Sequence, residues 1–120
     1  MSRTVVTLGL TLAGAAFALT VGATPALAGD EAQVKKGMEV YAAQKCAMCH
    51  SIAGKGNKMN PLDGVGTKLK AEEIKAWIVT PKEMTEKTKS TKKPLMPAKY
   101  DKLPAADIDA MVAYMQSLKK

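Results

Sequence analysis

The segment Cys46-Ala47-Met48-Cys49-His50 contains both cysteines and the only histidine of this 120-residue chain. C-x-x-C-H is the attachment signature of a c-type haem. Two thiols three positions apart can reach the two vinyl groups on one edge of a porphyrin, and the adjacent imidazole can ligate the iron. The segment therefore predicts one covalent haem, bound through Cys46 and Cys49, with His50 as a ligand of the iron.

Three other interpretations of this segment are weaker. A thioredoxin-like redox pair would need a β-α-β context, which the surrounding sequence lacks. A zinc site needs four ligands, whereas two cysteines and one histidine supply only three. A structural disulfide between Cys46 and Cys49 is geometrically awkward, and it would leave His50 without a role.

Upstream of the segment, residues 1–28 have the pattern of a secretory signal peptide. Arg3 gives a positive start, residues 5–21 are apolar or neutral, and Ala26-Leu27-Ala28 forms a cleavage site before Gly29. Cleavage would leave one domain, residues 29–120, exported to the periplasm. The alternative is a retained N-terminal anchor, although the many Thr, Gly and Ala residues make a weak membrane span.

The predicted mature chain is poor in aromatic residues and rich in lysine. It has no phenylalanine, and a domain of this size often needs a disulfide, a metal or a cofactor to complete its core. Removal of Arg3 leaves 17 of the 18 basic residues, all lysine, against 11 acidic ones, a formal charge of +6. This charge favours anionic partners. Nucleic acid is not expected, because no basic stripe is interleaved with aromatic residues.

Hydrophobic periodicity predicts helices at the start and in the middle of the mature chain. The first is expected over Asp30–Lys45, where small or apolar residues recur on one face (Val34, Gly37, Met38 and Tyr41). The second is expected over Ala71–Val79, with glutamates in its first turn and Pro81 after its end.

A last helix is predicted to begin with Pro104 at its first position. Its apolar stripe consists of Ile108, Met111, Val112, Met115 and Leu118. Residues 46–65 and 82–102 are predicted to be loops, the second of them rich in lysine. No segment alternates as a strand would, so the expected fold class is all-α.

In the order of its motifs the chain resembles the class I cytochromes c, small single-haem electron carriers, over nearly all of residues 29–120. The resemblance implies three to four helices wrapped around a covalently bound haem c with one edge exposed. C-x-x-C-H is highly specific, and the remaining motifs are weak alone but follow the family's order. They are Gly37 and Tyr41, Asn60-Pro61-Leu62, Gly64-Val65-Gly66, Pro81, Leu95-Met96-Pro97-Ala98 and residues 110–115. The long lysine-rich stretch between Pro81 and Met96 departs from the family pattern.

The residues leave two methionines, Met84 and Met96, as candidates for the second axial ligand of the iron. Three of the others, Met38, Met111 and Met115, lie on apolar helix stripes. Met48 lies inside the attachment segment, and Met59 lies too early in the chain. The resemblance favours Met96, because Met96-Pro97 matches the family's ligand position. A thioether is a soft ligand that favours Fe(II) and raises the reduction potential.

The resemblance also implies roles around the haem. The carbonyl of Pro61 would accept a hydrogen bond from the His50 ring. Alternatively, Pro61 is only a turn residue of the loop. Trp77 would pack against the haem, with its indole N–H near a propionate, although burial in the core is an equally ordinary role. Gly37 and Tyr41 are expected to meet Tyr114 where the first and last helices cross.

The function implied by the resemblance is that of an electron carrier rather than an enzyme. It would pass one electron at a time between redox proteins, which are expected to have acidic faces and to make transient contact with it. It would not insert stably into a membrane once the signal is cleaved. Lysines of residues 82–102 would steer these encounters, or they only solvate a loop. They are Lys82, Lys87, Lys89, Lys92, Lys93, Lys99 and Lys102. The alternatives are an enzyme or gas sensor with an open ligand position, and a dedicated subunit of a larger oxidoreductase.

Overall fold

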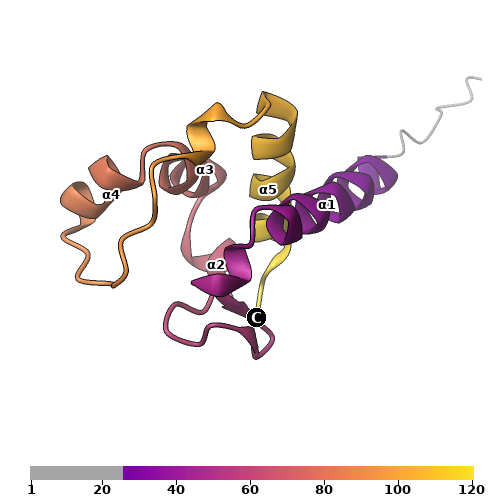
Figure 1. Cartoon of the computed structure of the whole chain (residues 1–120). Helices are drawn as coiled ribbons and strands as arrows, with labels where there is room; N and C mark the ends of the chain where they lie inside the picture. The colour runs from indigo at the N-terminus through magenta and orange to yellow at the C-terminus, as the bar shows by residue number, and fades with distance from the viewer. Residues whose placement is uncertain (1–25) are drawn as a thin grey trace, which may run out of the picture.

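The computed structural model describes residues 26–120, which form a helical domain with one small hairpin (Figure 1). In chain order the elements are α1 (Ala26–Ala43), the 3₁₀ turn η1 (Cys46–Met48), β1 (Ser51–Ile52), β2 (Lys55–Gly56), α2 (Val65–Lys68), α3 (Ala71–Val79), α4 (Pro81–Thr88), the 3₁₀ turn η2 (Tyr100–Lys102) and α5 (Ala105–Ser117). The all-α class is confirmed. Residues 1–25 of the predicted signal peptide lie outside the described range, so cleavage after Ala28 stays a prediction.

The middle helix has the bounds that the sequence predicts. At its start, the Glu73 carboxylate accepts a hydrogen bond from the Lys70 N–H at 2.8 Å. At its end, Pro81 has no N–H to continue the hydrogen-bond ladder, and the Thr80 N–H donates to the Ala76 carbonyl at 2.8 Å. The bounds of α3 therefore follow from two local features of the sequence.

The outer helices differ from their predicted bounds by a few residues. The first was expected over Asp30–Lys45, but α1 begins at Ala26 and ends at Ala43. Pro104 is the N-cap of α5 rather than its first helical residue. Its ring still fits this place, because the first N–H groups of a helix have no partner within the helix.

The prediction of a loop over residues 82–102 is wrong in its first part, because α4 (Pro81–Thr88) lies there. Pro81 ends α3 and also occupies the first turn of α4, where its fixed φ suits a helix. Within α4 only Pro81 and Met84 are buried. A helix of eight residues with two buried side chains has no repeating apolar stripe for periodicity to detect.

The segment predicted as a loop over residues 46–65 contains only short regular elements. After the turn η1, β1 and β2 pair as an antiparallel hairpin with Ser51 opposite Gly56, and the single-turn helix α2 begins at Val65. Strands of two residues are too short to show alternation in the sequence.

The core is organised by the crossing of α1 and α5, as the family resemblance implies. Gly37 is buried at the crossing, and a Cβ there would lie 2.6 Å from the Tyr114 Cβ and overlap the Ala110 carbonyl. The Tyr41 ring packs edge-to-face on Tyr114, with the ring centroids 5.8 Å apart and the planes at 82°. The absence of a side chain at Gly37 thus allows the two backbones to approach.

Met38 does not lie on the buried stripe that the sequence predicts, since it is 51% exposed. The buried face of α1 passes through Gly37 and Val40. Successive residues of a helix are rotated by about 100°, so Met38 points away from the crossing.

The last helix, α5, packs against both α1 and α3. Its predicted apolar stripe is buried at Ile108, Met111, Val112 and Met115. At the rim, Asp107 pairs with Lys36 of α1 and Asp109 pairs with Lys75 of α3, each at 3.0 Å. Such exposed ion pairs contribute about 0–1 kcal/mol each, so the apolar stripe supplies most of the packing energy.

Among the described residues, no helix is long and apolar enough to cross a membrane.

We predict that Gly37→Ala destabilises the protein by about 1–3 kcal/mol, because the new methyl group forces α1 and α5 apart. Helix propensity alone predicts the opposite sign, a gain of about 0.5–1 kcal/mol. Chemical denaturation of the haem-loaded protein measures the change. An unchanged or raised free energy of unfolding would contradict the close crossing.

Candidate functional site

The attachment segment forms a tight turn directly after α1. Lys45 adopts a left-handed conformation (φ 55°), and the N–H groups of Cys49 and His50 both donate to the Cys46 carbonyl, at 3.1 and 3.0 Å. Cys46 is buried and Cys49 is half-buried, and no disulfide joins them. Burial raises the pKa of the Cys46 thiol. This turn brings both thiols and the His50 ring to the same cavity.

Asn57, which sequence reasoning missed, holds the attachment segment from outside. Its N–H donates to the carbonyls of Ala47 and His50 at 2.9 and 3.0 Å, and its side-chain amide donates to the Met48 carbonyl at 3.0 Å. Its Oδ1 accepts from the Met59 N–H at 3.0 Å. One asparagine therefore satisfies three carbonyls of the segment that carries the thiols and the imidazole.

Gly56 makes the approach of Asn57 possible. Its φ is +103°, and a Cβ at this position would lie 3.1 Å from the Ala47 carbonyl oxygen and overlap that of His50. Any other residue would be strained and would push the hairpin away from the attachment segment.

The His50 ring is oriented by the carbonyl of Asn60, not by that of Pro61. The distance between His50 Nδ1 and the Asn60 oxygen is 2.9 Å. A carbonyl can only accept, so Nδ1 carries the proton and Nε2 remains free to bind a metal. The predicted acceptor, Pro61, is displaced by one position because the loop path presents the preceding carbonyl to the ring. Pro61 itself lines the cavity.

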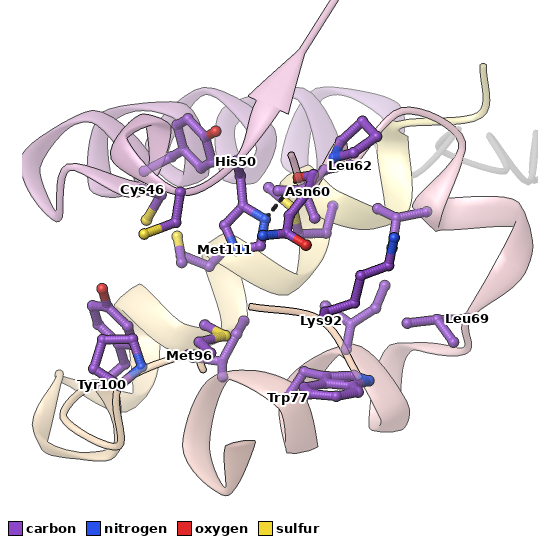
Figure 2. A pocket seen from close by; sticks show the side chains of 18 of the residues that line it. Cys46, His50, Asn60, Leu62, Leu69, Trp77, Lys92, Met96, Tyr100 and Met111 are labelled. Carbon is purple, nitrogen blue, oxygen red and sulfur yellow. Dashed lines mark hydrogen bonds between the residues drawn. The ribbon is translucent and has the colours of Figure 1, made fainter. Parts of the chain in front are cut away.

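A largely apolar cavity of about 480 Å³ lies beside the attachment segment. Its volume is in the range of about 300–1,000 Å³ that is usual for sites of small molecules and cofactors. Figure 2 shows His50 on one wall and Met96 on the opposite wall, with Cys46 at one end. The cavity therefore has nitrogen and sulfur groups on facing sides and thiols at its edge.

The structure separates the two methionines that the sequence leaves as candidates. Met96 lines the cavity, whereas Met84 is buried in α4 and is not part of the lining. Met111 and Met115 line it from α5 as part of the core. Of the two candidates, only Met96 offers its thioether to the space that His50 faces.

Trp77 and Tyr41 also line the cavity, from α3 and α1. The Tyr41 hydroxyl is buried without a hydrogen-bond partner among the described residues. Burial, followed by the neighbouring Cys46 thiol, raises the pKa of Tyr41 to about 12, so its hydroxyl stays protonated near neutral pH. Trp77 is half-buried, with its ring against the cavity (Figure 2).

Asn60 also connects the two walls. Its carbonyl binds His50, and its side-chain amide donates to the Lys93 carbonyl at 3.3 Å. Lys93 belongs to the irregular segment that leads to Met96. The loop on the histidine side is thereby tied to the loop on the methionine side.

These groups fit an iron porphyrin. The largely apolar cavity can hold the macrocycle, the thiols of Cys46 and Cys49 can bond its vinyl groups, and the free Nε2 of His50 can ligate the iron.

We predict that Asn57→Ala lowers the free energy of unfolding of the haem-loaded protein by about 0.5–1.5 kcal/mol, because it removes the side-chain hydrogen bond to the exposed Met48 carbonyl. The matched control is Lys58→Ala at the adjacent exposed position. Chemical denaturation followed by far-ultraviolet circular dichroism compares the two. Equal stabilities would show that Asn57 does not hold the segment.

The family model described as Cytochrome c matches residues 34–119 of the chain. The chain has no match among the curated proteins or the solved structures with which it was compared. The matched range includes the attachment segment, both walls of the cavity and the crossing of α1 and α5.

Proposed function

Because the chain belongs to the cytochrome c family, we propose that it is an exported single-haem carrier whose iron is ligated by His50 and Met96. It would work in the periplasm and exchange one electron at a time with redox proteins. The observation that carries this proposal is that the His50 imidazole and the Met96 thioether face the same cavity from opposite walls (Figure 2).

Members of this family bind haem c through thioether bonds to the cysteines of C-x-x-C-H, so Cys46 and Cys49 hold the haem of this protein. The protein is thus a haem-containing electron carrier, and its family is generally one of carriers rather than enzymes. When bound, the haem supplies a one-electron Fe(III)/Fe(II) couple. A single haem is supported by the single C-x-x-C-H segment.

The residues around the cavity have distinct roles in this proposal. The Asn60 carbonyl fixes the His50 tautomer and makes the ring a stronger ligand. Met96 would supply the second protein ligand of the iron, an uncharged sulfur that would favour Fe(II) and keep oxygen and peroxide from the metal. Pro61 and Trp77 line the cavity and would contact the macrocycle.

We predict that Met96→Leu removes the weak far-red sulfur-to-iron band of the ferric protein and lowers its reduction potential, because leucine has a similar volume but no thioether. The reduced variant should also bind carbon monoxide. Visible spectroscopy and redox titration measure these changes.

Met84→Leu is the matched control for this experiment, since it removes a buried thioether that does not line the cavity. It should keep the band and the potential. A band that survives Met96→Leu but disappears in Met84→Leu would reassign the ligand. Carbon monoxide binding by the unaltered protein would instead favour an enzyme or gas sensor with a displaceable ligand.

The surface supports transient contact with acidic partners. The lysines of residues 82–102 are exposed, and none belongs to an ion pair among the described residues. Lys99 lies against Tyr100, a residue of the cavity wall, with its Nζ 5.3 Å from the ring centroid. Positive charge beside the cavity would attract anionic partners to the place where electrons leave.

We predict that the rate of electron transfer with an anionic iron hexacyanide complex falls by about ten-fold as ionic strength rises, because screening removes the attraction. With a cationic cobalt complex the rate should rise instead. Stopped-flow spectroscopy measures both rates. Neutralising Lys99 and Lys102 to glutamine should weaken both dependences, and flat dependences would mean that the lysines only solvate the surface.

A further inference from the structure

The two ends of the cavity differ in chemistry. Figure 2 shows Cys46 and Tyr100 at one end, and Leu69, Trp77 and Lys92 at the other. Thioether bonds to the cysteines fix the vinyl edge of the haem at the first end. The two propionates are carried on the opposite side of the macrocycle, so they are directed toward the second end.

A propionate at this second end needs a polar partner. Leu62 and Leu69 give this part of the cavity apolar walls (Figure 2). A carboxylate that leaves water for apolar surroundings is costly unless a donor or a positive charge accompanies it. The Trp77 indole can donate one hydrogen bond, but it carries no charge.

Lys92 differs from the other lysines of residues 82–102, because it alone among them lines the cavity. In Figure 2 its side chain extends across the end of the cavity near Leu69 and Trp77. The adjacent Lys93 is exposed and does not line the cavity, and its carbonyl accepts the hydrogen bond from Asn60.

Lys68 also lines the cavity, but its side chain folds toward the end of the chain. Its Cε is 3.9 Å from the position that a Cβ on Gly64 would take, and the Lys120 backbone lies beside the same position at 3.6 Å. Lys68 therefore directs its stem over Gly64, which leaves Lys92 as the better placed cation.

We propose that the Lys92 ammonium pairs with a haem propionate and so fastens the loop that carries Met96 to the cofactor. The pairing itself follows from the haem and from the position of Lys92. The fastening of the ligand rests on the proposed function, in which Met96 binds the iron. Lys92 is thus a positioning residue, distinguished from the other exposed lysines of residues 82–102 because it lines the cavity.

The test compares Lys92→Gln, Lys93→Gln and Lys68→Gln in the haem-loaded protein, since each removes one positive charge. Titration of the ferric protein with imidazole, followed at the far-red band, measures how easily the Met96 thioether is displaced. We expect Lys92→Gln to bind imidazole about two- to five-fold more tightly, as the loss of a partly exposed ion pair implies. Lys93→Gln and Lys68→Gln should match the unaltered protein, and Lys92→Arg should restore its affinity.

Redox difference infrared spectra with ¹³C-labelled propionates give a second measurement that does not depend on Met96. The carboxylate bands should shift in Lys92→Gln and not in Lys93→Gln. Equal effects in all three glutamine variants, or no effect in any, would overturn the pairing, and an effect confined to Lys68→Gln would assign the propionate to that lysine. If the unaltered protein lacks the far-red band, ligation by Met96 fails, while the infrared comparison still decides the role of Lys92.

Discussion

At Gly37 the backbone of α1 approaches α5 so closely that even a methyl group would overlap the Ala110 carbonyl. The same two helices supply the parts of the site that must meet. The attachment segment follows the end of α1, and Met111 and Met115 of α5 form part of the cavity wall. A wider crossing would move the thiols away from the cavity that they serve. The packing of one glycine thus determines the geometry of residues far from it in the sequence.

Local chemistry could be predicted from the sequence, whereas the paths of the loops could not. Cys46, Cys49 and His50 are recognisable because their identities and spacing carry the information. The bounds of α3 follow from Glu73 and Pro81 for the same reason. In contrast, the helix α4 was missed because only two of its residues, Pro81 and Met84, are buried.

The hydrogen bonds of the site show the same limit. His50 binds the carbonyl of Asn60 rather than that of Pro61, and every residue has a carbonyl, so side-chain identity does not reveal which one faces the ring. Asn57 was missed because its partners are the backbone groups of Ala47, Met48, His50 and Met59. The resemblance to a family favoured Met96 over Met84, and the cavity supports that choice through the lining alone.

The ion pairs on α5 have a consequence for the whole molecule. Asp107 and Asp109 neutralise Lys36 and Lys75, whereas residues 82–102 carry seven lysines against three acidic residues, and none of these lysines forms an ion pair among the described residues. Positive and negative charge are therefore distributed unevenly, which gives the protein an electric dipole moment. In the field of a charged partner a dipole experiences a torque before any surface contact, over a screening length of about 8 Å at physiological salt. The protein can thus be turned during its approach, so that fewer collisions present the wrong face.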